Sequence, residues 1–154
     1  MNKILNWDQY FMALTKLSAL RSKDPNTKVG ACIINNRKRV IALGYNGMPS
    51  GNDFDFPWAR DKKLEKDNKY PYVVHAEINA ILNSTTQLEN AILYTSLFPC
   101  SNCSKTIVQS GITEIVYLED KYHDTDDAWI SRKILKDSNI KTRKLEPLNI
   151  TLEL

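Results

Sequence analysis

This 154-residue chain has few cysteines, no long apolar run and a small net charge, and each of these features excludes some classes of protein. No segment approaches the roughly 18 consecutive apolar residues that a membrane-spanning helix needs. The first residues carry charge and polarity where a signal peptide would be apolar, so we expect a cytoplasmic protein without a membrane partner. The three cysteines are an odd count, and two of them stand three positions apart. In a chain without a secretion signal, this spacing favours metal or redox chemistry over disulfides.

The net charge of +3 is too small to require a nucleic-acid polymer as a partner, and a small anionic ligand would satisfy it. The basic cluster of residues 37–39 lies between two strand-like runs, where we expect a solvated hairpin turn. The remaining cysteine, Cys32, lies in the apolar run VGACII. Free cysteine is among the most buried residue types, so Cys32 is predicted to belong to the core.

The first half of the chain predicts one helix, one hairpin and one long loop. Apolar residues recur at helical spacing over residues 7–20. We expect the following side chains of this helix to face the core: Trp7, Tyr10, Phe11, Leu14 and Leu17. Two β-rich runs, 29–35 and 39–45, flank a polar turn and should pair as a hairpin. Residues 46–72 hold several glycines and prolines among charged residues, so regular structure should be scarce there.

The second half alternates helices with strands. Helices are predicted from about His75, Cys100 and Asp126, and strands over 91–96, 113–119 and 140–145. Together with the hairpin, this alternation predicts a three-layer α/β/α sandwich with a mixed central sheet of about five strands. Neither repeats nor a linker interrupt the pattern, so residues 1–154 are expected to form a single domain.

Chemistry-bearing residues gather in two short strings, HAE and PCSNC, and each string opens a predicted helix. Zinc takes imidazole and thiolate ligands tetrahedrally, and three protein ligands leave a fourth position for water. His75, Cys100 and Cys103 form such an open set. The two cysteines, three apart on one helical turn, lie on the same face and can reach one ion. A Cys-x-x-Cys pair alone would equally fit a redox pair or half of a structural zinc site.

Glu77 stands two residues after His75, at the start of the same predicted helix. A carboxylate there can take a proton from attacking water and deliver it to a substrate, which is general acid and base catalysis by one residue. The pattern H-x-E followed by P-C-x-x-C is the known signature of zinc deaminases, in which this glutamate has that role.

Over nearly its whole length the sequence resembles the deoxycytidylate deaminases of the cytidine deaminase-like superfamily. The segments that carry the resemblance are RSKDPNTKVGACI from Arg21, GYNGMPSG from Gly44, YPYVVHAEINAI from Tyr70, LFPCSNC from Leu97 and DKYHDTD from Asp120. The zinc strings are common to the superfamily. The combination of GYNGMP with DKYHD distinguishes this family from relatives that act on nucleosides, guanine or tRNA.

The resemblance implies hydrolysis of dCMP to dUMP and ammonia, with one zinc per chain, and dUMP would supply thymidylate synthesis. Glu77 would protonate ring nitrogen 3 of cytosine and then carry a proton to the departing amine. Asn46 would hold the sugar hydroxyl, although it could instead be a turn residue. The backbone N–H of Ala76 would donate to the base carbonyl. Tyr122 would contact the nucleotide, although a surface tyrosine without a ligand fits its position equally well.

Phosphate recognition and regulation are further expectations. Ser22 and Lys23 stand at the start of a loop and offer hydrogen-bond donors that suit a small anion, so we expect them to bind the substrate phosphate. The resemblance also implies a homohexamer activated by dCTP and inhibited by dTTP, with Mg²⁺ accompanying the triphosphates. Gly44, Tyr45 and Gly47 are candidate allosteric contacts, because small residues let a backbone approach a nucleotide.

Three alternatives stay open. The enzyme could deaminate dCTP as well as dCMP, because the number of phosphates accepted depends on loop geometry. An RNA or single-stranded DNA editing deaminase would use the same zinc chemistry but would need a basic groove for flanking nucleotides. A zinc-stabilised module could bind nucleotides without turning them over, although the presence of Glu77 argues against it.

Overall fold

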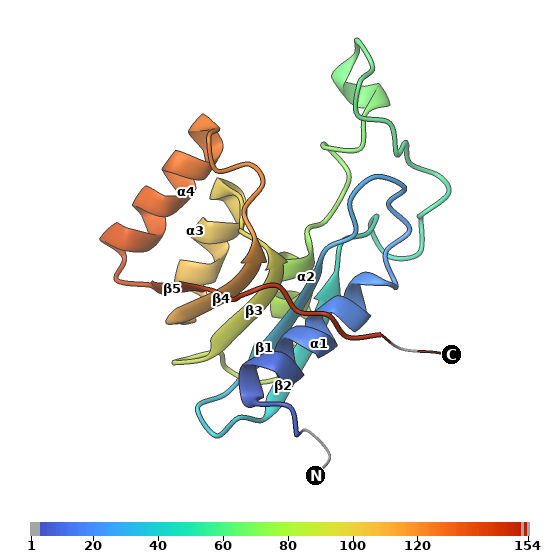
Figure 1. Ribbon diagram of the computed structural model, residues 1–154. Helices are drawn as coiled ribbons and strands as arrows, with labels where there is room; N and C mark the ends of the chain where they lie inside the picture. Colours follow the sequence, from blue (N-terminus) through green and yellow to red (C-terminus); the bar gives the residue numbers. More distant parts are fainter. Residues whose placement is uncertain (1–3, 152, 154) are drawn as a thin grey trace.

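A computed structural model describes residues 4–151 and residue 153, and its centre is one sheet of five strands (Figure 1). The strands are β1 (Gly30–Ile34), β2 (Val40–Tyr45), β3 (Ile92–Leu97), β4 (Glu114–Glu119) and β5 (Lys141–Lys144). Their order in the sheet is β2-β1-β3-β4-β5. β1 runs antiparallel to both β2 and β3, whereas β3, β4 and β5 are parallel. The predicted hairpin and the mixed five-stranded sheet are therefore confirmed.

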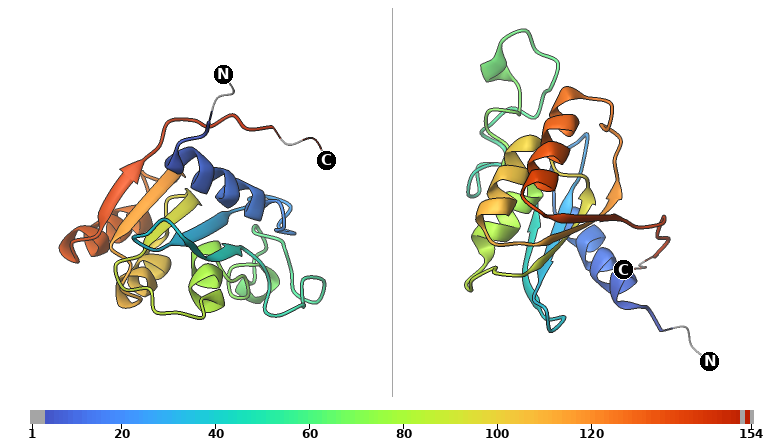
Figure 2. Two further views of the ribbon diagram at one scale, coloured as in Figure 1. Left: turned by 90° about the horizontal axis from the view of Figure 1, so that it is seen from below. Right: turned by 90° about the vertical axis from the view of Figure 1, so that its left-hand side faces the viewer.

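Helices cover both faces of the sheet, which confirms the predicted three layers (Figure 2). The helices are α1 (Trp7–Ala19), α2 (Ala76–Asn83), α3 (Ser101–Gln109) and α4 (Asp126–Asp137), with a short 3-10 helix at η1 (Glu65–Asp67). The first helix shares one face with the C-terminal segment, and the other three α-helices pack on the opposite face. None of the helices in the described part of the chain has the length and apolarity needed to cross a membrane.

Alternation along the strands divides the core into two layers. Successive side chains of a strand point to opposite faces of the sheet. Cys32 and Ile34 therefore pack in the layer beside α1, whereas Ala31 and Ile33 pack in the layer beside α2 and α3. Cys32 has no exposed surface, and burial raises the pKa of its thiol to about 12, which confirms it as a core residue.

The first helix buries a different face from the one predicted. Trp7, Tyr10 and Leu17 are 50%, 43% and 42% exposed, so assigning them to the core was wrong. Phe11 is buried as predicted, and the rest of the buried face is built by Met12, Thr15, Ser18 and Ala19. These residues are mostly small because α1 lies very close to β1, where a Cβ added to Gly30 would lie 1.9 Å from the carbonyl oxygen of Thr15. The helix itself carries apolar side chains on several of its faces, so their spacing in the sequence could not show which face is buried.

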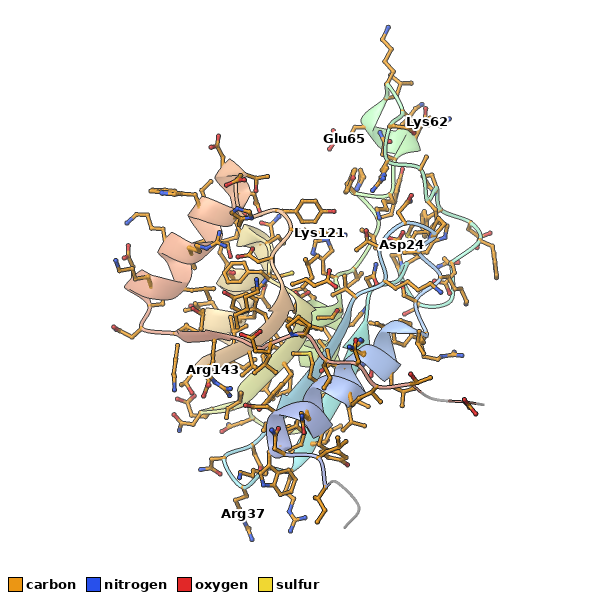
Figure 3. All side chains as sticks on the ribbon, viewed as in Figure 1. Asp24, Arg37, Lys62, Glu65, Lys121 and Arg143 are labelled. Carbon is orange, nitrogen blue, oxygen red and sulfur yellow. The ribbon has the colours of Figure 1, made fainter. Side chains whose placement is uncertain are left out.

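The long loop has little regular structure, as predicted, and it projects beyond the sheet (Figure 1). It contains η1 and ends at an isolated antiparallel bridge between Gly47 and Val74. The basic turn between β1 and β2 is exposed, and Arg37 points away from the molecule at its tip (Figure 3), which confirms the solvated hairpin. Gly111 follows α3 with φ +89°, as expected of a glycine at a helix end.

Gly44 allows α2 to lie directly on β2. A Cβ at this position would come within 2.3 Å of the carbonyl oxygen of Ala76 and 2.4 Å of the amide nitrogen of Ala80. Asn79 and Asn83 of α2 donate hydrogen bonds to the backbone of β2 beside it, at 2.8 and 3.1 Å. The open side of Gly44 is thus filled by protein, which corrects the expectation that its small size serves the approach of a nucleotide.

We predict that Gly44→Ala lowers the free energy of unfolding by about 1–3 kcal/mol, because the methyl group must push α2 away from the sheet. Gly47→Ala is the matched control, since the nearest atom to its added Cβ is 3.7 Å away and its φ is not positive. Urea denaturation of both variants measures the difference. Equal stability of the two variants would show that the packing of α2 on β2 can accommodate a methyl group at position 44.

Candidate active site

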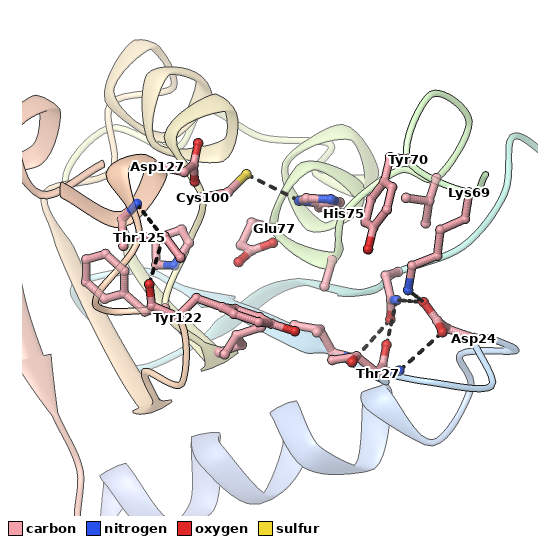
Figure 4. Close-up of a pocket in the computed structure, with 18 of the residues that line it drawn as sticks. Asp24, Thr27, Lys69, Tyr70, His75, Glu77, Cys100, Tyr122, Thr125 and Asp127 are labelled. Atoms are coloured by element: carbon pink, nitrogen blue, oxygen red, sulfur yellow. Dashed lines mark hydrogen bonds and ion pairs between the residues drawn. The ribbon is translucent and has the colours of Figure 1, made fainter. Parts of the chain in front are cut away.

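Two helix starts meet at one edge of the sheet and bring the predicted metal ligands together. His75 is the N-cap of α2 and Cys100 is the N-cap of α3, and both have extended backbone conformations. An N-cap residue lies half outside its helix, so each side chain can point away from the helix end. Cys103 follows one turn into α3 and is buried on the same side. In Figure 4 the side chains of His75 and Cys100 point toward each other across the gap.

The distances within this cluster fit one tetrahedral zinc ion. The Nδ1 atom of His75 lies 3.4 Å from the sulfur of Cys100 and 3.3 Å from that of Cys103. All three ligand atoms lie within 4.8 Å of one another. Zinc–nitrogen and zinc–sulfur bonds of ordinary length at tetrahedral angles place N and S about 3.5 Å apart. The donor set is therefore spaced for a metal, and it leaves one coordination position free of protein.

The electrostatics of the cluster favour negative charge on the sulfur of Cys100 and disfavour it on that of Cys103. Hydrogen bonding from Cys103 lowers the pKa of Cys100 to about 4, against the opposing effect of burial, and His75 adds to the decrease. The same bond, together with burial, raises the pKa of Cys103. Hydrogen bonding to Cys100 raises the pKa of His75 although burial opposes this. One thiol is thus already prepared as a thiolate, and a bound cation would favour the second thiolate as well.

Glu77 lies beside the ligands in the first turn of α2 and is almost completely buried, with 4% of its surface exposed. Its Oε1 accepts a hydrogen bond from the hydroxyl of Thr95 at 3.2 Å, and its Oε2 lies 3.6 Å from the sulfur of Cys103. Burial raises the pKa of this carboxyl above its ordinary value, although the charge of His75 opposes the increase. A carboxyl group with a raised pKa can both take up and release protons near neutral pH.

A cavity of about 320 Å³ opens onto this cluster. Figure 4 shows side chains that line it. The sequence-predicted site residues that line it are Asn46, His75, Ala76, Glu77, Cys100 and Tyr122. Cys103 lies behind the wall of the cavity, where it completes the ligand set. Six of the predicted residues therefore reach one cavity although they come from four separate segments of the chain.

The structure does not bring Ser22 and Lys23 into this cavity. The hydroxyl of Ser22 is buried and donates to the carbonyl oxygen of Asn46 at 2.8 Å. The ammonium of Lys23 pairs with Asp53 at 2.6 Å outside the cavity. Both side chains hold the surrounding loops together in this structure, which differs from the predicted phosphate contact. Tyr45 and Gly47 also lie outside the cavity lining.

Sequence reasoning missed several residues of the cavity wall. Asp24 and Lys69 form a buried ion pair there, and Arg60 and Tyr70 come from the same long loop. A signal was available for Asp24, which lies within a segment that carries the family resemblance, and Lys69 directly precedes another such segment. Charged residues in an irregular segment are usually solvated, so neither was singled out.

A second missed group fixes the start of α3. Asp127 accepts hydrogen bonds from the amide and the hydroxyl of Ser101, at 3.1 and 2.5 Å. The hydroxyl of Ser131 donates to the carbonyl oxygen of Pro99 at 2.7 Å, and its oxygen lies 2.7 Å from that of Ser104. These contacts come from α4 and surround Cys100. The helix α4 therefore fixes the position of the first turn of α3 and of the residues just before it, which carry the two cysteines.

Comparison with known proteins agrees with this geometry. The sequence model described as the cytidine and deoxycytidylate deaminase zinc-binding region matches residues 5–119. Deoxycytidylate deaminase of Homo sapiens is 48% identical over 145 residues, which cover 93% of this chain and 82% of the human protein. The Saccharomyces cerevisiae deoxycytidylate deaminase is 39% identical over 144 residues, covering 90% of this chain and 45% of the yeast protein. The crystal structure of dCMP deaminase from the cyanophage S-TIM5 in complex with dCMP and dUMP has a TM-score of 0.70 and 28% identity, over 90% of this chain and 96% of that chain. The chain therefore belongs to the cytidine and deoxycytidylate deaminase family and is a deaminase.

Proposed function

We propose that this protein hydrolyses the exocyclic amine of dCMP, producing dUMP and ammonia, and that it supplies dUMP for thymidylate synthesis in the cytoplasm. The observation that carries the proposal is the ligand cluster of His75, Cys100 and Cys103 beside the buried carboxyl of Glu77. The names of the human and yeast relatives and the dCMP and dUMP bound in the cyanophage structure support dCMP as the substrate.

We assign one zinc ion per chain to His75, Cys100 and Cys103, because their spacing and donor chemistry fit it. When bound, zinc would act as a Lewis acid and lower the pKa of water in its open position, which makes a nucleophile available at neutral pH. The two cysteines at a helix start would balance the charge of the ion as thiolates. The neutral imidazole of His75 would complete the set.

Glu77 moves the protons in this proposal. Its carboxylate would accept a proton from the water that adds to carbon 4 and deliver it to ring nitrogen 3 of cytosine. It would then carry the second proton of that water to the amine, so that the carbon–nitrogen bond breaks, the carbonyl forms and ammonia leaves. The hydrogen bond from Thr95 orients one carboxylate oxygen, and the other oxygen faces the sulfur of Cys103. The exclusion of bulk water by burial keeps the proton on this path.

The nucleotide would be held by groups on three sides of the cavity. The N–H of Ala76, in the first turn of α2, has no acceptor within its own helix and would donate to the base carbonyl. Asn46 would bind the sugar hydroxyl, and Tyr122 would cover the nucleotide from the opposite segment. Arg60 supplies positive charge to the cavity wall, which suits a phosphorylated substrate.

We predict that Glu77→Gln keeps zinc and the fold but loses a factor of about 10² to 10⁴ in kcat, because an amide cannot carry protons. Loss of dCMP absorbance in the ultraviolet measures the rate, and elemental analysis measures zinc. Glu65→Gln, an exposed carboxylate in η1, is the matched control and should retain the full rate. A Glu77→Gln variant within tenfold of the wild-type kcat would refute the assigned role.

We also propose a homohexamer that dCTP activates and dTTP inhibits, with Mg²⁺ bound to the triphosphates. Support comes from the exposed apolar side chains of Trp7, Tyr10 and Leu17 on α1 and of Val40 and Leu43 on β2. A surface of this kind is suited to contact with further copies of the chain. Tyr45 and Gly47 stay candidate effector contacts outside the catalytic cavity.

Regulation by a second site predicts sigmoidal dCMP saturation that becomes hyperbolic when dCTP and Mg²⁺ are added. The effector must bind outside the zinc cavity and favour the conformation with the higher affinity for dCMP. Initial rates with and without each triphosphate measure this, and light scattering measures the mass. A monomer with hyperbolic kinetics that neither triphosphate changes would refute the regulatory proposal without affecting the assigned chemistry.

A further inference from the structure

A buried ion pair in the cavity wall has no role in the chemistry described so far. Asp24 and Lys69 are 45 positions apart in the sequence, and the ammonium lies 2.5 Å from Oδ2 of the carboxylate. Their side chains are only 1% and 9% exposed. Figure 4 shows the ammonium of Lys69 facing the carboxylate of Asp24. Burying two charges is costly even when they are paired, and such a pair is weak evidence of added stability. A function at the site is therefore the better explanation of its presence.

The carboxylate of Asp24 receives hydrogen bonds from three segments. Its Oδ1 accepts the amides of Asn26 and Thr27, at 2.8 and 3.2 Å. Its Oδ2 accepts Lys69 and the side-chain amide of Asn46, the latter at 3.3 Å. Burial alone would raise the pKa of Asp24, but Lys69 and the two backbone amides outweigh it and lower the pKa. An ionised carboxylate can only accept hydrogen bonds.

This arrangement permits a single orientation of the Asn46 amide. Its Nδ2 donates to the carbonyl oxygen of Thr27 at 2.9 Å as well as to Asp24, and its Oδ1 accepts the amide of Val29 at 2.9 Å. A flipped amide would direct its oxygen at two acceptors and its NH₂ group at a donor. Both hydrogens of Nδ2 are used, so the remaining capacity of Asn46 is the second lone pair of Oδ1. That lone pair suits a hydroxyl group that donates.

We infer that the Asp24–Lys69 ion pair is a positioning device for the nucleotide: Lys69 holds Asp24 in place, and Asp24 fixes Asn46 as an acceptor for a ligand hydroxyl. Lys69 can hold this position because its backbone is anchored as well. Its amide donates to the carbonyl oxygen of Ala59 at 2.7 Å, and its carbonyl oxygen accepts the amide of Val73 at 2.8 Å. The inference rests on the proposed function, since dCMP supplies the hydroxyl.

A direct contact between Lys69 and the substrate phosphate is the competing role, because the ammonium has donors beyond the one that Asp24 accepts. The two roles differ in their coupling to Asn46. A residue that acts through Asn46 loses its effect once Asn46 is removed, whereas a phosphate contact keeps its effect.

The test is a double-mutant cycle with Lys69→Met, Asn46→Ala and the double variant, using kcat/KM for dCMP. Lys69→Met should lower kcat/KM by about 10- to 100-fold, mainly through KM, because Asp24 is no longer held in place and Asn46 is positioned less precisely. The double variant should be no slower than Asn46→Ala alone. Losses that multiply would overturn the inference and favour the phosphate contact. A Lys69→Met variant with wild-type kinetics would also overturn it.

Controls separate this outcome from misfolding and from failure of the proposed function. Lys63→Met changes an exposed lysine of the same loop and should keep wild-type kinetics. Zinc content and melting temperature should show that each variant is folded and loaded. If Lys69→Met does not fold, the double variant Asp24→Asn/Lys69→Met removes both charges and should show the same loss in kcat/KM. Wild-type kinetics of this double variant would overturn the inference. A wild-type protein inert toward dCMP would refute the proposed function and the inference together, whereas an active one with multiplying losses would refute the inference alone.

Discussion

The site depends on one constraint, which is that the starts of α2 and α3 must face each other closely enough for His75 to meet Cys100 and Cys103. Neither helix contains all three of these side chains, so the tertiary contact between the helices creates the candidate metal site. Binding energy of a metal held only by the folded chain adds to the free energy of folding. The same contact places Glu77 next to this cluster, and it therefore determines both the candidate metal site and the proposed proton path.

Several contacts outside this cluster hold the starts of α2 and α3 in place. The missing side chain of Gly44 lets α2 lie on the sheet, and Asp127 of α4 fixes the first residue of α3. Thr95 lies beneath the site on β3 and orients the carboxyl of Glu77. On the other side of the cavity, the Asp24–Lys69 pair joins the long loop to the segment before β1. Changes in these supporting groups should therefore alter chemistry without touching a ligand.

The sequence predicted the fold and the cluster of His75, Cys100 and Cys103 because both depend on local sequence patterns. HAE and PCSNC open helices directly, and alternating strands and helices imply the layers. It failed for Trp7 because a helix with apolar residues on several sides does not reveal which side is buried. It missed the Asp24–Lys69 pair because 45 residues separate its members, and only the path of the long loop brings them together. Lys23 looked free to bind phosphate, but the fold supplies Asp53 as its partner.

The most direct test of this account is a zinc titration of protein from which metal has been removed by a chelator. Zinc is added stepwise while bound metal and dCMP turnover are measured together. The account predicts that turnover rises in proportion to bound zinc and stops rising at one ion per chain. Cys103→Ala should bind no zinc and show no turnover, whereas Cys32→Ala, which changes a core cysteine far from the ligand set, should retain both. Full turnover by metal-free protein, or by Cys103→Ala, would contradict it.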